Sequence, residues 1–248
     1  ALYVSMTFQS LFLQGGLGYT PLAAGAIGLP VAIMLTLLST PAGQLAGRWG
    51  PRIFMTVGPL IMALGVLWLA RIPADSAPWL ADLARPDTLL PPADALLDVG
   101  IGISVFGLGL AAMVAPLTTA LMSSVPVRNA GLGSAINNAI SRAGSPLVFA
   151  VIFVAIVSSY YPALASMLPG VDLTDPAVRE AVRPFSVGAD LEPAVAEAAR
   201  EAATGSFHLA MFVSAALLAV GAAINGFGIE NPSVTRKSPA ADPAPGVG

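Results

Sequence analysis

The chain has 248 residues, of which 56% are hydrophobic and only 10% are charged, with a formal net charge of −3. Soluble domains are about 25% charged, so this composition indicates a membrane protein. The absence of cysteine excludes disulfides, thiolate metal sites and cysteine nucleophiles, and a single histidine makes a metal site unexpected. No basic patch is present, which argues against a nucleic-acid partner.

Six apolar segments are long enough, or nearly long enough, to cross about 30 Å of hydrocarbon as helices. They occupy residues 1–14, 21–46, 53–70, 96–123, 134–160 and 207–229. Backbone amides have no partners in lipid, and these runs do not alternate in polarity, so helices rather than a barrel are expected. The predicted fold class is therefore all-α, a polytopic bundle of six transmembrane helices. Ala1 lies within an apolar segment without an initiator Met, so we expect further residues to precede it.

The connections between these segments alternate in charge. Arginine or lysine follows the second, fourth and sixth segments, at Arg48, Arg52, Arg128, Arg236 and Lys237. The loops 71–95 and 161–206 carry an excess of acids instead. Because basic residues favour cytoplasmic loops, both ends of the chain are predicted to be cytoplasmic. Within the second loop we expect short helices at 175–182 and 192–203, and we expect the tail, 230–248, to be disordered.

Four motifs follow one another along these segments: FLQGGLGYTPLAAG, PAGQLAGRWGPR, GLGLAAMVAPLTT and NAGLGSAINNAISRAG. Together they resemble the C-terminal half of major facilitator superfamily exporters, most closely the fourteen-span drug:proton antiporter branch. The resemblance covers nearly all of residues 1–229. It implies a multi-pass protein of the bacterial cytoplasmic (inner) membrane, and an N-terminal half of the same transporter as the partner of this chain.

The loop between the second and third segments carries most of a family motif. In the resembling family the motif has the form Gly-x-x-x-Asp-Arg-x-Gly-x-Arg. Gly43, Arg48, Gly50 and Arg52 match it, whereas Gly47 stands where the acid is expected. Two interpretations are open: a tight turn whose arginines set the topology, or a gating element of the transport cycle.

The fifth segment has polar side chains that recur at helical spacing. Ser134, Asn138, Ser141 and Ser145 recur on one helical face, and Arg142 borders it. Charged residues in a span usually face the bundle or a water-filled cavity, so Asn138 and Arg142 are candidates for the translocation path. Alternatively, Arg142 extends to lipid phosphates at the membrane boundary.

Other candidate residues lie on the remaining segments. Gln9, Phe12 and Gln14 mix amides with an aromatic ring, which suits large apolar cargo, although such amides also bond neighbouring helices. Pro30, Pro41 and Pro116 are predicted to bend their helices, because proline lacks the N–H of a helical hydrogen bond.

Apart from Asp98 and His208, at the outer ends of the fourth and sixth segments, no Asp, Glu or His lies inside the six predicted segments. Proton relays in membranes generally use carboxylates or histidine, and arginine does not release its proton. The predicted function is therefore that of a fragment of a proton-coupled exporter of hydrophobic or drug-like compounds. This half would line one wall of the cargo cavity, and the proton carboxylate would lie in the N-terminal part. The alternatives are a dedicated exporter of a lipid or an endogenous antibiotic, and a structural or receptor subunit. The sequence has no intramembrane catalytic motif, so we predict no enzyme activity and no cofactor.

Overall fold

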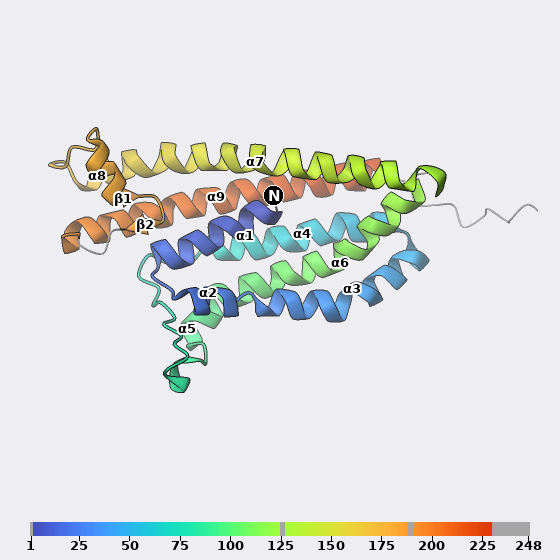
Figure 1. Cartoon of the computed structure of the whole chain (residues 1–248), viewed down its shortest axis with the longest axis horizontal. Helices are drawn as coiled ribbons and strands as arrows, with labels where there is room; N and C mark the ends of the chain where they lie inside the picture. Colours follow the sequence, from blue (N-terminus) through green and yellow to red (C-terminus); the bar gives the residue numbers. More distant parts are fainter. Residues whose placement is uncertain (1, 125–126, 188–190, 230–248) are drawn as a thin grey trace, which may run out of the picture.

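A computed structural model describes residues 2–124, 127–187 and 191–229, and the predicted disordered tail lies outside them. Long helices run side by side over most of the described chain (Figure 1). In chain order, the helices are α1 (Leu2–Leu11), α2 (Pro21–Ala26), α3 (Leu29–Trp49), α4 (Pro51–Leu69), α5 (Ala93–Ala95), α6 (Ile101–Ser124), α7 (Ala130–Met167), α8 (Pro176–Ala181) and α9 (Pro193–Gly228). The π-helical turns η1 (Phe12–Gly16) and η3 (Leu96–Gly100) continue α1 and precede α6, and η2 (Pro86–Thr88) and η4 (Val127–Asn129) are 3₁₀ turns.

The helical membrane class is confirmed, and the number of long spans differs from the expectation. Five segments of the described chain are long and apolar enough to cross a membrane, where six were predicted. They are Pro21–Trp49, Pro51–Leu69, Pro86–Thr118, Gly131–Met167 and Pro193–Gly228. The first predicted span corresponds to the 10 residues of α1 and the 5 of η1. At ~1.5 Å per residue these rise about 22 Å, less than the hydrocarbon thickness.

Helix α9 begins earlier than the sequence suggested. The helix expected at 192–203 is not separate: it forms the first part of α9, so the long loop is shorter than 161–206. Ala199, Ala203, Phe207 and Ala210 are all fully buried and follow helical spacing, so one packing face runs through the whole segment. Gly205 interrupts neither the spacing nor the helix.

The packing of the long helices follows a simple order. Helix α6 packs against α3 and α4, and α9 packs against α4 and α7, so that Figure 1 shows the succession α7, α9, α4, α6, α3. Helix α1 lies on α9 and α7. Glycines permit close approach between α4 and α6: a Cβ on Gly65 would lie 2.5 Å from the Phe106 nitrogen, and one on Gly109 would lie 2.5 Å from the Gly58 oxygen.

The prolines expected to bend helices have different positions. Pro41 and Pro116 lie inside α3 and α6, which continue through them. Pro30 lies in the first turn of α3, just after the interruption at Ile27 and Gly28 that separates α2 from α3. Proline is tolerated in a first turn, so Pro30 marks a helix start rather than an internal bend.

One element departs from the all-α prediction. Strands β1 (Val182–Arg183) and β2 (Ser186–Val187) pair antiparallel as a small hairpin after α8. Phe185, at its turn, has φ of 60°, which is uncommon for a bulky residue, and is only 5% exposed. Its ring lies 6.0 Å from that of Phe12 and 6.5 Å from that of Phe8. Burial of this ring fixes the hairpin to α1 and η1.

Candidate functional site

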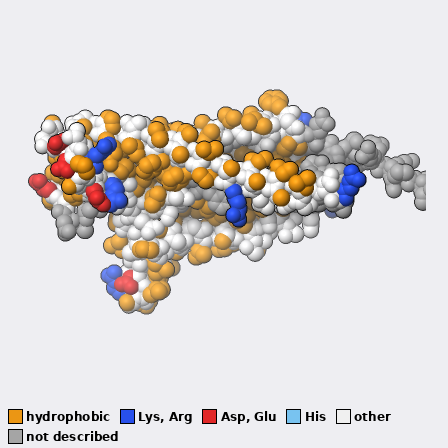
Figure 2. Space-filling model, turned by 45° about the horizontal axis from the view of Figure 1, so that its top comes forward, with side chains coloured by type: hydrophobic (Ala, Val, Ile, Leu, Met, Phe, Trp, Pro, Cys, Tyr) orange, Lys and Arg blue, Asp and Glu red, His pale blue; other side chains and the backbone are white. Residues whose placement is uncertain are grey.

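The charged residues divide the bundle into two ends. One end of the bundle carries the loops 70–92 and 168–192. We call it the acidic end, because every described acid lies within 75–98 or 172–201. The basic end, where α3 and α6 end and α4 and α7 begin, carries Arg48, Arg52 and Arg128. Figure 2 shows the same division on one face: red side chains gather at one end and on the projecting loop, and hydrophobic side chains cover the middle.

Helix α7 joins a buried half to an exposed half. Toward the acidic end, Ile152, Ile156, Tyr160 and Leu164 are fully buried at spacings of four, on the side that packs against α9. No described residue from 131 to 151 is buried. The basic half of α7 therefore has little protein against it within this chain.

The polar side chains of α7 continue the line of its buried face. Ser145 precedes Ile152 by seven residues, which is two helical turns, and Ser141 and Asn138 precede Ser145 by four and seven. Most of the strongly exposed apolar residues lie on the opposite side, among them Ile136, Ile140, Leu147, Val151 and Val154. We call Ser134, Asn138, Ser141, Ser145 and the adjoining Arg142 the α7 polar face. The α7 polar face lies on the side of the helix that is buried farther along the chain, at Ile152 and Ile156.

The α7 polar face remains accessible in this chain. Asn138, Ser141 and Arg142 are exposed, and the Ser145 hydroxyl donates a 2.9 Å hydrogen bond to the Ser141 carbonyl. Polar and charged groups are costly in hydrocarbon, which favours water, cargo or another part of the protein as the neighbour of this face. Arg142 lies 12 residues after the start of α7, about 18 Å along a helix of about 57 Å. That depth is near the edge of a ~30 Å hydrocarbon layer, so contact with lipid phosphates is also open to it.

A second polar stripe lies on α3 and was missed by the sequence reading. Thr36, Thr40 and Gln44 are exposed, at spacings of four, from the middle of α3 toward the basic end. The Thr36 hydroxyl donates to the Ala32 carbonyl at 2.8 Å, as hydroxyls in membrane helices often do. We call these three residues the α3 polar stripe. Their i, i+4, i+8 spacing can be read from the sequence, but the apolar residues between them, mostly leucines, make it easy to overlook.

The candidates from the first segment do not form one open surface. Phe12 is fully buried, with its ring stacked 3.9 Å from that of Phe207, so it belongs to the core and does not line an open cavity in this chain. Gln9 is half-buried. Gln14 is exposed and donates a 3.0 Å hydrogen bond from Nε2 to the Ser10 hydroxyl.

The motif loop at the basic end is a one-residue connection. Gly50 has φ of 88°, a region that favours glycine, and its N–H donates to the Ala46 carbonyl at 2.9 Å. Pro51 then begins α4 directly. A Cβ on Gly43 would lie 3.1 Å from the Ala115 Cβ, so this glycine allows α3 to approach α6. The structure thus explains why glycine occupies positions 43 and 50 of the motif. Arg48 and Arg52 are exposed beside them.

Two titratable groups within the long apolar segments, Asp98 and His208, contact the loop at the acidic end. Asp98, in η3, accepts a 2.7 Å hydrogen bond from the Ser76 hydroxyl, and a ring nitrogen (Nε2) of His208 lies 2.8 Å from the Ile72 carbonyl. Tyr19, in the connection before α2, is buried, and its hydroxyl has no partner. Burial, with the nearby charges of Asp98 and Asp94, raises the pKa of Tyr19 to about 12. No cluster of three potential metal-ligating side chains occurs in the part of the chain that the structure describes.

These features define a multi-pass α-helical membrane protein with polar faces at one end of its bundle. No family model matches the chain. The multidrug resistance protein Stp of Mycobacterium tuberculosis is 32% identical over 152 residues, which are 61% of this chain and 25% of that protein. A triacylglyceride transporter of Mycolicibacterium hassiacum is 38% identical over 141 residues, 54% of this chain and 24% of that protein. The uncharacterized MFS-type transporter EfpA of M. tuberculosis is 28% identical over 148 residues, 60% of this chain and 25% of that protein.

The resemblance to the major facilitator superfamily is confirmed by these relatives: two are named as transporters, one of them as MFS-type, and the third is named as a multidrug resistance protein. The matched region is about a quarter of each relative's length.

Proposed function

We propose that this chain is part of a secondary active exporter that moves hydrophobic or drug-like compounds by alternating access. In this proposal, the six-helix unit of residues 1–229 is the C-terminal half, and an N-terminal half of the same transporter faces it. The match to only a quarter of each relative supports a partner of this kind.

The observation that supports the proposal is an uncovered polar face on the side of α7 that is buried farther along the helix. The α7 polar face follows the line of the buried residues Ile152 and Ile156, yet no described residue before Ile152 on α7 is buried. A face turned to lipid would be apolar, as the opposite side of α7 is. We infer that Asn138 and Arg142 border the cargo path and that the α3 polar stripe contributes to the same wall.

We also propose that proton influx drives export and that the proton carboxylate lies in the N-terminal half. The described acids are confined to 75–98 and 172–201, and Asp98 and His208 are both bonded to the loop at the acidic end. None of them belongs to the polar faces near the basic end. In this scheme the membrane is the bacterial cytoplasmic membrane, with the basic end inside the cell, as the positive-inside rule favours.

Transport by variants of α7 tests this proposal. The protein at its native length is placed in everted membrane vesicles, and uptake of ethidium and of uncharged Nile red is followed after a proton gradient is imposed. Arg142→Ala and Asn138→Ala are expected to lower the initial rate about tenfold, and Arg142→Lys to retain part of it if positive charge alone is needed. Ile140→Ala, on the opposite face and 68% exposed, is the matched control and should leave the rate unchanged.

Normal rates in Arg142→Ala and Arg142→Lys at equal protein levels would remove Arg142 from the path. Uptake that persists when the proton gradient is collapsed, while another ion gradient drives it, would contradict proton coupling. The absence of any flux in vesicles would favour a structural or receptor subunit instead.

Export of one dedicated lipid is the second candidate function. The relative named as a triacylglyceride transporter is 38% identical over its matched region, the highest identity of the three compared above. Transfer of radiolabelled triacylglycerol by the same vesicles, without ethidium or Nile red uptake, would favour this candidate over drug export.

A further inference from the structure

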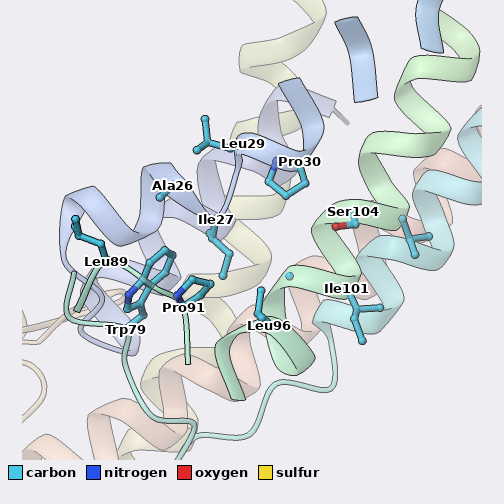
Figure 3. Close-up of a pocket in the computed structure, with 12 residues that line it drawn as sticks. Ala26, Ile27, Leu29, Pro30, Trp79, Leu89, Pro91, Leu96, Ile101 and Ser104 are labelled. Carbon is cyan, nitrogen blue, oxygen red and sulfur yellow. The ribbon is translucent and has the colours of Figure 1, made fainter. Parts of the chain in front are cut away.

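The helix α4 contains a proline within its length, and the surrounding protein closes around it. Pro59 lies inside α4, and both Pro59 and Gly58 are buried. The break between α2 and α3, at Ile27 and Gly28, is different, because it leaves an apolar cavity of about 540 Å³ against the loop 70–92 and the start of α6 (Figure 3). The question at Pro59 is therefore what satisfies the backbone there.

Pro59 leaves one backbone carbonyl of α4 without its usual donor. In a regular α-helix the N–H of residue 59 would donate to the Met55 carbonyl, four residues earlier, but proline has no N–H. Met55 is only 7% exposed, and α4 is long and apolar enough to cross a membrane. Hydrocarbon offers no water as a replacement donor, so the Met55 carbonyl requires one from elsewhere in the protein.

Asn225 of α9 supplies this donor. Its Nδ2 donates a 2.8 Å hydrogen bond to the Met55 carbonyl, and the bond joins residues 170 positions apart in the chain. Asn225 is itself a polar side chain in an apolar helix, where an amide without a partner is costly. One hydrogen bond therefore removes an energetic cost from both helices.

The surrounding contacts hold α9 close to α4 at this point. A Cβ on Gly226 would lie 3.3 Å from the Thr56 side chain, so the backbone of α9 approaches the turn of α4 that contains Met55. The residues of α9 that precede Asn225 by seven and by three, Leu218 and Ala222, are buried. Asn225 thus ends the face of α9 that packs against the bundle, on the side of α4.

The hydrogen bond lies next to the motif turn at the basic end. Met55 follows Pro51, the first residue of α4, by four positions, and Gly50 joins α4 to α3. Asn225 lies in the last turn of α9, which ends at Gly228. The bond therefore connects the α4 side of the motif turn to the end of α9.

We propose that Asn225 is an interhelical clasp, which fastens the last turn of α9 to the proline interruption of α4 so that the two move as one body. It follows that any movement of the motif turn takes place on the α3 side of Gly50. The clasp is a property of the fold and does not rest on the proposed export. It can hold if export fails, and it can fail without affecting that function.

A double-mutant cycle on the native-length protein tests the clasp, with unfolding by SDS in mixed micelles as the measurement. Asn225→Leu should raise the equilibrium constant for unfolding about tenfold, because it leaves the buried Met55 carbonyl without a donor. In the Pro59→Ala background the N–H of residue 59 serves that carbonyl, so Asn225→Leu should raise the constant less than about threefold. Ile224→Ala, next to Asn225 and 65% exposed, is the matched control and should have the same effect in both backgrounds.

Distances between spin labels test the mechanical consequence. This chain contains no cysteine, so labels can be placed on cysteines introduced at Ile53 and Phe227, which are 49% and 90% exposed. Double electron–electron resonance should give a narrow distance distribution between them, and Asn225→Leu should broaden it about twofold through local opening. The double variant with Pro59→Ala should narrow it again.

Three results would overturn the proposal. The first is an equal effect of Asn225→Leu in both backgrounds, which would mean that Asn225 acts by packing alone. The second is an unchanged distance distribution in Asn225→Leu. The third is a Pro59→Ala protein that does not fold, because it would show that packing requires the proline. If Asn225→Leu alone does not fold, the double variant should, and failure of the double variant would count equally against the clasp.

Discussion

The two ends of the bundle are built differently. At the acidic end, the rings of Phe8, Phe12, Phe185 and Phe207 pack together and join α1, α9 and the hairpin. At the basic end, α7 and α3 present exposed polar side chains, and no described residue of α7 before Ile152 is buried. The chain therefore folds on itself at one end and leaves polar surface at the other, which indicates that the second end is completed by water, cargo or further protein.

The largest effect is expected from the aromatic core of the acidic end. Phe12→Ala should lower the free energy of unfolding by about 3–5 kcal/mol, because it empties a fully buried site between Phe207 and Phe185. Unfolding by SDS in mixed micelles measures the change. Asn138→Ala, exposed at the other end, is the comparison and should stay within about 0.5 kcal/mol of the wild type. Equal losses in the two variants would show that the ends are equally packed.

A pair of glycine substitutions should act in opposite directions. A Cβ on Gly15 would lie only 1.5 Å from the Phe185 carbonyl oxygen, so Gly15→Ala forces the hairpin away from η1 and should lower the free energy of unfolding by about 1–3 kcal/mol. Gly131, in the first turn of α7, has space for a Cβ: beyond its chain neighbours and the backbone of its own helix, nothing lies within 4 Å. Gly131→Ala should therefore raise the free energy of unfolding by about 0.5–1 kcal/mol through helix propensity. Thermal denaturation of both variants in the same detergent decides the comparison, and a stable Gly15→Ala would contradict the docking of the hairpin.

An alkaline titration should reveal the burial of Tyr19. The pKa of its hydroxyl rises from 10.0 to about 12 in the folded protein, so the unfolded chain releases this proton at lower pH. The contribution of Tyr19 to stability is fully present below pH 10 and is lost as the pH rises toward 12. Tyr19→Phe should therefore unfold at higher pH than the wild type, as followed by circular dichroism. Identical alkaline midpoints would mean that this hydroxyl ionises without a penalty.

The smallest change in stability is expected on the α3 polar stripe. Gln44→Leu should leave the free energy of unfolding within about 0.5 kcal/mol of the wild type, since Gln44 is exposed. If the stripe lines the cargo path, the same variant should lower the rate of ethidium uptake about fivefold. Leu45→Ala, the neighbouring exposed residue off the stripe, controls for a general effect on α3. A destabilised Gln44→Leu with normal transport would assign this amide to packing instead.

Much of the helical architecture was predictable, and the reasons are local. The apolar runs around Arg48 and Arg52 predicted a helical pair, and the structure has α3 and α4 there with Gly50 between them. The position of Ser134, Asn138, Ser141 and Ser145 on one face of α7 also followed from helical spacing. By contrast, the burial of Phe12 was not predictable, because its neighbours Phe185 and Phe207 come from segments more than 170 residues away. The continuity of α9 through 193–206 was missed for a similar reason, since its alanines show their packing face only against the rest of the bundle.

The amino-acid order alone determined that this is a helical membrane protein with its acids toward one end, because a bilayer accepts only long, mainly apolar helices and an acid is costly within them. Which face of each helix is covered was decided by the tertiary structure. The α2–α3 break produces a cavity only because the loop 70–92 and the first turns of α6 lie beside it. Likewise, α1 and α9 bury only the half of α7 nearer the acidic end, so the α7 polar face stays open in this chain. Such pairings depend on residues far apart in the sequence.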